Sequence, residues 1–318
     1  MSNNNLMTTT SEVEPAVQVF YDRVLLRVPT PAYIYGSKHV EMSTLARNSG
    51  NTVKWRRFNR LSAATTVVTE GLTPSGSRLS KVDITAKVSQ YIDYVTITDI
   101  VDLTNQDPVI TETVRLQNDQ MNNTDDQLAR DYICSSASTT TASSGAGPTT
   151  LLNETDIMGI HSTLRADNID YISSMITAGT GQGTAPVRAA YLAKADTVLE
   201  DDLEDVTGFK HVTNYSAQSG VDSAEYGSTG PVRWLTSTQG FTSGSNYYCP
   251  FIGKVAGQWP VGKVNLTAGN ARSIIKSFGQ SGTSDPANQR STVAWKMLQA
   301  YRILQELAVH ILIVTNGS

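Results

Sequence analysis

The strongest constraint on the fold is a regular alternation of apolar and polar residues over 81–88. This period of two predicts a β-strand with one apolar face. Its apolar members are Val82, Ile84, Ala86 and Val88. Further along the chain, Val95 and Ile97 are apolar at odd positions. Because side chains along a strand keep to one face, this shift predicts a bulge or a change of partner strand near residues 90–93.

A second alternating segment, residues 52–58, precedes a turn-rich stretch at 70–77. The two segments together predict a long two-stranded arm with a solvent-rich tip, rooted in the body of the protein. In the first segment, Trp55, Arg56 and Arg57 place basic groups beside an aromatic ring. This combination suits either nucleic acid or an acidic patch on a neighbouring subunit. On a projecting arm, we expect these three residues to contact a neighbouring subunit.

One long helix is predicted to follow the arm. Asp107 and Pro108 form a good helix start, because Asp caps free N–H groups and Pro fits the first turn. An apolar stripe then continues on one face for roughly six turns. Its members are Ile110, Val114, Met121, Leu128 and Tyr132.

The N-terminal region divides into a polar tail at 1–14 and a short amphipathic helix that starts near Pro15. The apolar stripe of this helix includes Phe20, Val24 and Leu25. A short helix with one apolar face must dock on a larger body, which is either its own chain or a neighbour. We expect these three side chains to anchor the arm in an intersubunit contact.

The remainder of the chain mixes helices and strands. The small-residue stretch at 135–150 and the Ser/Gly/Thr-rich stretch at 215–245 predict loops. Helices are expected at 155–168 and 196–203. Strands are expected at 171–177, 188–193, 206–214 and 247–255. The C-terminal segment fits either a helix or a pair of strands, because its apolar residues satisfy both periods.

Composition narrows the classes of function. The 318 residues carry a formal net charge of -4, without the strong basic field of a dedicated nucleic-acid binder. The longest apolar run, 307–314, falls short of the roughly 20 residues that span a bilayer, and the N-terminus lacks a signal-peptide pattern. Two distant cysteines without a CxxC context indicate a reducing compartment and no zinc site. We therefore expect no membrane partner.

The sequence carries few residues in patterns typical of catalysis. Four isolated histidines form no metal-binding spacing, and neither a nucleophile elbow nor a nucleotide-binding loop is present. The sequence predicts no enzyme, and no catalytic, cofactor-binding or metal-binding residue. The acidic run at 200–205 leaves one alternative open, a metal-dependent hydrolase that holds a hard cation through carboxylates.

Several segments resemble, in the same order, the major capsid proteins of tailed bacteriophages. They are Val53-Lys-Trp-Arg-Arg-Phe58, Thr69-Glu-Gly-Leu-Thr-Pro74, the segment 91–102, the helix start at Asp107-Pro108, and the closing segment 279–314. The resemblance is strongest over 45–135. It implies an α+β chain with the Hong-Kong-97-type fold, whose closing segment forms strands.

The resemblance also implies a division of the chain. Residues 1–44 would form the N-terminal arm, 45–100 the extended E-loop hairpin with its base strands, and 101–151 the P-domain with its long spine helix. Residues 152–285 would form the A-domain, and 286–318 would return to the P-domain. Some relatives join subunits covalently through an E-loop lysine. The expected tip, residues 70–80, contains no lysine, so that chemistry is not predicted here.

As a function, the resemblance implies a coat subunit that self-assembles into hexamers and pentamers of an icosahedral head. The head would enclose double-stranded DNA without reading its sequence. The expected partners are further copies of the chain, a portal, and scaffold or decoration proteins. The expected location is the virion, after assembly in the host bacterial cytoplasm. An encapsulin-like nanocompartment shell is the alternative with the same fold.

Overall fold

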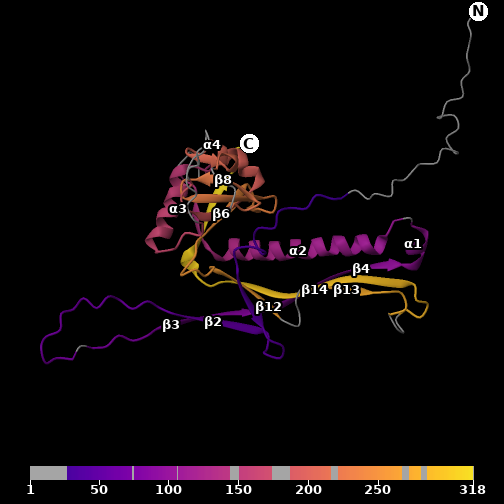
Figure 1. Cartoon of the computed structure of the whole chain (residues 1–318), viewed down its shortest axis with the longest axis horizontal. Helices are drawn as coiled ribbons and strands as arrows, with labels where there is room; N and C mark the ends of the chain where they lie inside the picture. The colour runs from indigo at the N-terminus through magenta and orange to yellow at the C-terminus, as the bar shows by residue number, and fades with distance from the viewer. Residues whose placement is uncertain are drawn as a thin grey trace, which may run out of the picture.

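The computed structural model describes residues 27–73, 75–105, 107–143, 150–173, 187–215, 221–266, 272–280 and 285–317. Figure 1 shows an elongated molecule with three parts: a compact lobe, a long helix lying along a sheet, and a hairpin that projects away from both. Among the described residues, no helix combines the length and apolar character needed to cross a membrane.

The projecting hairpin consists of β2 (Thr52–Phe58) and β3 (Lys81–Lys87), which pair antiparallel with Trp55 opposite Ile84. The two-stranded arm predicted by the alternation is therefore confirmed. Its apolar face packs at the root on Leu45 of β1 (Glu41–Leu45) and on Val264. Beyond Phe58 the chain leaves the ladder, and described residues 59–80 are exposed to solvent.

The shift in alternation marks a change of partner strand. β3 ends at Lys87, and β4 (Ser89–Thr98) leaves the hairpin to pair antiparallel with β14 (Arg290–Ile303). The change occurs at Val88, slightly before the expected 90–93, because the buried Val88 side chain completes the apolar cluster at the hairpin root. Past this point the odd-numbered Ile97 becomes the buried residue of β4.

The predicted long helix is α2 (Val109–Ser136), which starts one residue later than expected, with Pro108 at the N-cap position. It lies along the sheet formed by β1, β12 (Val261–Leu266), β14, β13 (Arg272–Lys276) and β4 (Figure 1). The Trp295 indole N–H of β14 donates to the Gln120 side chain of α2 at 2.9 Å. A short helix, α1 (Asp99–Thr104), joins β4 to α2 and was not predicted.

The compact lobe contains an eight-stranded mixed sheet in the order β5-β15-β11-β6-β9-β8-β7, with β10 paired to β11. Its strands are β5 (Ser138–Thr141), β6 (Tyr191–Asp196), β7 (Phe209–His211), β8 (Glu225–Thr229), β9 (Val232–Ser237), β10 (Phe241–Ser243), β11 (Asn246–Ile252) and β15 (Val309–Thr315). Helices α3 (Glu154–Ala166) and α4 (Glu200–Asp205) accompany the sheet. The fully buried Trp234 packs edge-on against Phe251, with ring centroids 5.4 Å apart.

Two of the predicted loops contain strands. The stretch 215–245 holds β8, β9 and β10, and β9 lies in the middle of the lobe's sheet. Likewise, β5 forms within 135–150 by pairing parallel with β15. Small polar residues have little intrinsic preference for strands, so strands form in these segments only through pairing with distant parts of the chain. Most of the strand expected at 171–177 lies outside the described residues, and the one expected at 206–214 shortens to β7.

The C-terminal segment forms strands, as the resemblance implied, and not the alternative helix. The observed division of the chain differs from the expected one in two places. β12 and β13 pair in the long sheet, although they fall within 152–285. β15 pairs with β11 in the compact lobe, although it falls within 286–318.

Candidate assembly surfaces

The root of the hairpin is bound to its own chain through the inner face of β2. The Trp55 indole N–H donates to Ser43 Oγ at 3.0 Å. The Arg57 guanidinium donates to the Leu304 carbonyl oxygen at 3.3 Å and to the Gln305 side chain. These two predicted contact residues are therefore half-buried within one chain, and they set the direction in which the hairpin projects.

The outer face of the hairpin carries exposed charge. Asp83 of β3 lies 2.8 Å from Lys54 Nζ and 2.9 Å from Arg56 Nε, with Lys81 Nζ at 3.8 Å. The hydrogen bonds from Lys54 and Arg56 lower the pKa of Asp83 to about 2, so the carboxylate stays ionised at neutral pH. One anion thus faces three cations, and the predicted contact residue Arg56 lies on the exposed face of the arm.

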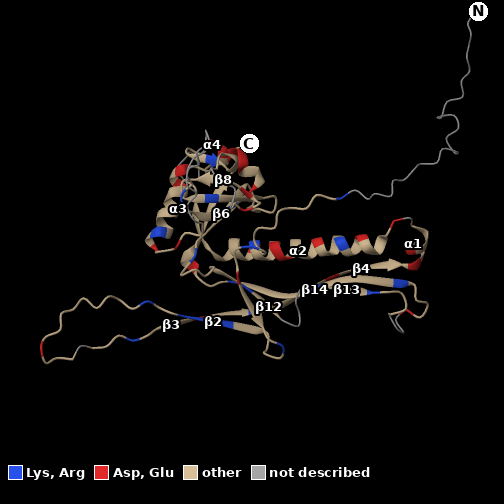
Figure 2. Cartoon of the chain, in the orientation of Figure 1, with Lys and Arg blue, Asp and Glu red and all other residues tan. Residues whose placement is uncertain are grey.

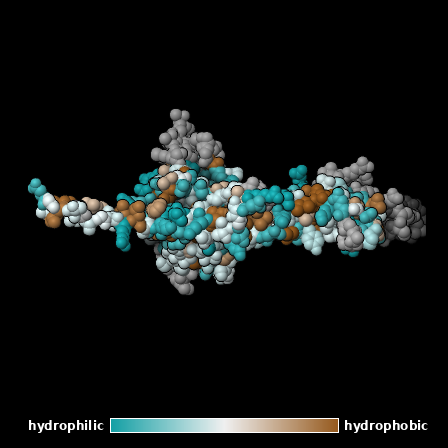
Figure 3. Space-filling view, turned by 90° about the horizontal axis from the view of Figure 1, so that it is seen from below, coloured by the Kyte–Doolittle hydropathy of each residue, from teal (hydrophilic) through white to brown (hydrophobic). Residues whose placement is uncertain are grey.

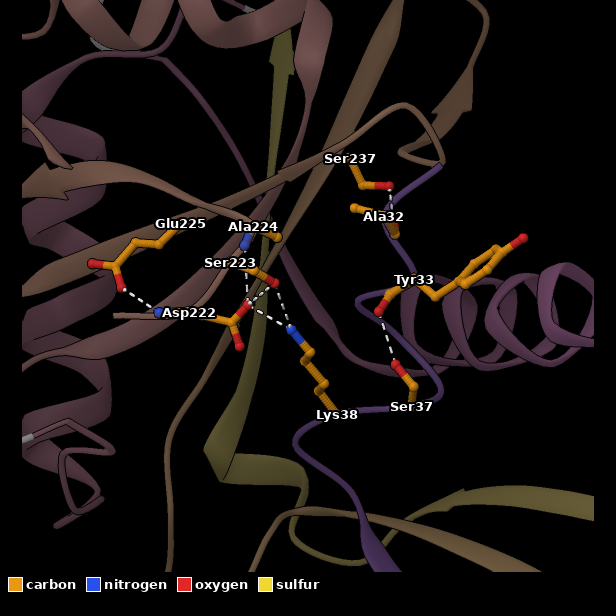
Figure 4. Close-up of polar contacts among 9 residues, drawn as sticks. All are labelled: Ala32, Tyr33, Ser37, Lys38, Asp222, Ser223, Ala224, Glu225 and Ser237. Carbon is orange, nitrogen blue, oxygen red and sulfur yellow. Dashed lines mark hydrogen bonds and ion pairs between the residues drawn. The ribbon is translucent and has the colours of Figure 1, made fainter. Parts of the chain in front are cut away.

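Residues 27–40, which we call the strap, run from the compact lobe across α2 to β1. Figure 4 shows the lobe side: Lys38 Nζ lies 2.6 Å from Asp222 Oδ1, and the Ser237 hydroxyl donates to the Ala32 carbonyl oxygen at 2.6 Å. On the helix side, the Tyr33 hydroxyl donates to Asp119 Oδ1 at 2.6 Å. The strap therefore joins the lobe to the long helix.

The centre of the strap is held by one buried carboxylate of α2. Asp126, which is 1% exposed, accepts the backbone N–H groups of Tyr35 and Gly36 on Oδ1 at 2.7 and 2.8 Å. Burial raises the pKa of Asp126 although these hydrogen bonds oppose the shift. The fully buried Lys194 of β6 lies with Nζ 5.0 Å from the Tyr35 ring centroid, and burial lowers its pKa to about 8.

A second acidic residue of α2 ties the strap to the long sheet. Asp125 lies 2.5 Å from Lys263 Nζ of β12 and accepts the Tyr301 hydroxyl of β14. Lys263 Nζ also donates to the Gly36 carbonyl oxygen at 3.3 Å. Sequence reasoning missed this junction, because the adjacent acids Asp125 and Asp126 read only as the polar side of an amphipathic helix.

The remaining predicted residues are the three N-terminal contact residues and the acidic run at 200–205. Phe20, Val24 and Leu25 lie outside the described residues. The acidic run at 200–205 forms α4, where Glu204 accepts the Tyr226 hydroxyl and Asp202 accepts the Gly317 N–H. Within the described ranges, no three His, Cys, Asp or Glu side chains are grouped so that they could hold a metal ion.

The histidines and cysteines contact ordinary structural neighbours. Each histidine has a different partner: His39 lies beside Trp259, His161 bonds to Tyr171, His211 to Thr213 and His310 to Thr140. Both cysteines are buried, and burial raises the pKa of Cys134 to about 12 and that of Cys249 still further. Neither thiol is activated as a nucleophile.

No protein-family model matches the chain, and no curated protein matches it. Solved structures of bacteriophage capsids match it over nearly its whole length. The capsid of cyanophage P-SCSP1u aligns at a TM-score of 0.69 and 13% identity, covering 99% of this chain and 97% of that chain. The capsid of Ralstonia phage GP4 aligns at 0.67 and 12% identity, covering 96% of both chains. The acid-stable capsid of Helicobacter pylori bacteriophage KHP30 aligns at 0.66 and 12% identity, covering both chains completely.

At these identities the likeness establishes the fold. The chain has the α+β fold of bacteriophage capsid structures, as the resemblance of its sequence segments predicted.

Proposed function

We propose that the chain is the major capsid protein of a tailed double-stranded DNA bacteriophage and assembles into hexamers and pentamers of an icosahedral head. The most direct support is the structural alignment: this chain and the chains of several phage capsid structures match over nearly their full lengths. A shared lobe alone could serve many functions, but these matches extend over nearly the whole of each chain. The encapsulin-like alternative is not favoured, because the matching structures are phage capsids.

The parts of the molecule fit this role. We assign the hairpin with its base strands to the E-loop, α2 and the long sheet to the P-domain, and the compact lobe to the A-domain. Residues 1–44, which include the strap, correspond to the N-terminal arm. Because an exposed hairpin cannot bury its own apolar side chains, its contacts come from neighbouring subunits. Many small interfaces, each repeated around a closed shell, add up to a stable particle.

The proposal includes partners and location. The subunit contacts further copies of itself and a portal, with scaffold or decoration proteins as additional partners, and it resides in the virion after assembly in the bacterial cytoplasm. Its formal net charge of -4 suits a wall that encloses DNA without holding it tightly, since tight binding requires clustered cations. The role is structural, as the match to capsid structures suggests.

Negative-stain electron microscopy of the purified recombinant chain tests the proposal. We expect closed shells or rings of subunits, and sedimentation should show large species. A chain that remains a dispersed, folded monomer at high concentration, both alone and with its co-expressed phage neighbours, would refute the assignment.

Three variants examine the predicted contacts. Deletion of residues 1–28, which include Phe20, Val24 and Leu25, should abolish shells and leave a folded body. Arg56→Ala should weaken assembly in a salt-sensitive way, because Arg56 lies on the exposed face. Arg57→Ala is the matched comparison: it removes an in-chain contact, so it should also loosen the hairpin root in the unassembled chain. Shells that tolerate all three changes would exclude these residues from the interfaces.

A further inference from the structure

The hairpin is held to the body of its own chain at the root. Figure 3 shows it leaving the body as a narrow arm, and described residues 59–80 are exposed. The buried apolar cluster at the root is small and consists of Leu45, Ala86, Val88 and Val264. Because a long arm turns a small tilt at its root into a large displacement of its tip, the contacts at the root decide where the tip points.

Neither packing nor charge fixes the angle between the hairpin and the long helix. A groove of about 550 Å³ lies between them, lined by Lys87 and Ser89 on the hairpin side and by Leu128 and Tyr132 of α2. Close-packed side chains would resist a tilt, but here the groove leaves room for one. Figure 2 shows basic residues along the root, yet the ion pairs of the described hairpin residues, all to Asp83, join only its own two strands.

One arginine of the long sheet bridges the hairpin and the helix. Arg302 of β14 donates from Nε to the Thr85 carbonyl oxygen of β3 at 2.9 Å. It also donates from Nη1 to the Tyr132 hydroxyl of α2 at 3.1 Å, with its guanidinium carbon 5.7 Å from the centroid of the Tyr132 ring. A guanidinium is a rigid planar fork, so binding both partners at once fixes the spacing between β3 and α2.

The second strand of the hairpin has its own tie to the body. Arg57 of β2 donates to the Leu304 carbonyl oxygen at 3.3 Å and to the Gln305 side chain, directly after the end of β14. Arg302 lies just before that end, beyond the residues of β14 that pair with β4, which stop at Gln299. A hairpin tied through one strand can pivot about it. Tied through both strands, it keeps one angle.

We propose that Arg302 is a positioning residue that, together with Arg57, fixes the angle of the hairpin and thereby sets the curvature of the shell. A hairpin held at one angle before subunits meet lowers the cost of ordering it during assembly. Because a closed shell repeats the same contact many times, a small change of angle changes the size at which the shell closes. The curvature role rests on the proposed function, whereas the angle is a property of the single chain.

Spin labels on Phe58→Cys and Ser135→Cys measure the distance between the hairpin and α2 in the unassembled chain. Phe58 ends the paired part of β2 and is exposed, and the native cysteines are buried, so labels attach to the introduced pair. We expect one narrow distance distribution. Arg302→Met should at least double its width, whereas Arg272→Met, a matched change at an exposed position of β13, should not. Equal widths in the two variants would overturn the proposal.

Electron microscopy of assembled particles tests the curvature role. We expect one diameter for the wild type and for Arg272→Met, and mixed diameters or open fragments for Arg302→Met. Tyr132→Phe removes only the hydroxyl acceptor and should shift the diameters in the same way. Arg302→Met particles that keep the wild-type diameter, at whatever yield, would overturn the curvature role and leave the proposed function intact. A wild-type chain that forms no particles would instead refute the proposed function, and the spin-label distances would still decide whether Arg302 positions the hairpin.

Discussion

Removal of the Asp126 carboxylate should detach the strap from the long helix. The carboxylate is 1% exposed and accepts two backbone N–H groups, those of Tyr35 and Gly36, which are themselves buried. In Asp126→Ala neither donor has an acceptor. A buried donor left unsatisfied costs about 1–3 kcal/mol, so the two together cost about 2–6 kcal/mol. This is a large part of the roughly 5–15 kcal/mol that stabilises a typical domain.

Asp126→Asn is the matched control for this prediction. The asparagine keeps a carbonyl oxygen in the place of Oδ1, so the N–H groups of Tyr35 and Gly36 retain an acceptor. Both substitutions remove the negative charge that supports the buried Lys194 ammonium. That cost is common to the two variants and cancels in their comparison.

Urea unfolding of the unassembled chain measures the difference. We expect Asp126→Ala to be less stable than Asp126→Asn by about 2–6 kcal/mol, and limited proteolysis should cut its strap faster. If the two variants unfold at the same urea concentration and their straps resist protease equally, the hydrogen bonds to Asp126 do not hold the strap, and the reasoning fails.

Two further predictions concern the same junction. A Cβ at Gly36 would lie 2.7 Å from Tyr301 Oη and 2.9 Å from the Asp125 carbonyl oxygen, so Gly36→Ala should lower the thermal midpoint, while Gly76→Ala, with nothing within 4 Å, should not. Lys194 has a pKa of about 8 in the folded protein against 10.5 in an ordinary setting. The unfolded chain therefore binds the extra proton between these values, and the stability of the wild type relative to Lys194→Met should rise from pH 8 to 10.5. A stability difference that stays constant over this range would contradict the lowered pKa of the buried Lys194.

The junction also explains why the strap belongs to the body of the subunit and not to a free tail. Its contacts reach α2, the long sheet and the compact lobe, and a cluster of buried residues including Ile34, Tyr35, Ile133 and Leu235 connects the same three parts. The relative placement of lobe and sheet therefore depends on a segment that carries no helix or strand. A change in the strap is transmitted to the position of the lobe, which in a shell would alter the contacts between neighbours.

The local elements with a strong period could be predicted from the sequence. The alternation over 81–88 identified the hairpin, and the stripe from Ile110 to Tyr132 identified α2, because each pattern alone places apolar side chains on one face. The change of partner after β3 was also visible as a shift of phase. The exposed position of Arg56 could be predicted from the alternation over 52–58, because Arg56 lies on the other face of this strand from Trp55 and Arg57.

The tertiary structure decided whatever depends on long-range pairing. The stretches at 135–150 and 215–245 consist largely of small polar residues, so they carry no period. The strands within their described residues form because β15, β11 and β6 provide partners for them. The C-terminal apolar residues satisfy a helix and a strand equally well, and β14 is extended because β4 lies ready to pair with it along ten residues. In the same way, the sequence placed Asp126 on the solvated side of the long helix, whereas in the structure the strap covers this residue. A periodic pattern in the sequence indicates which face of a helix or strand is buried. It does not indicate which element packs on that face, because only folding brings distant parts of the chain together.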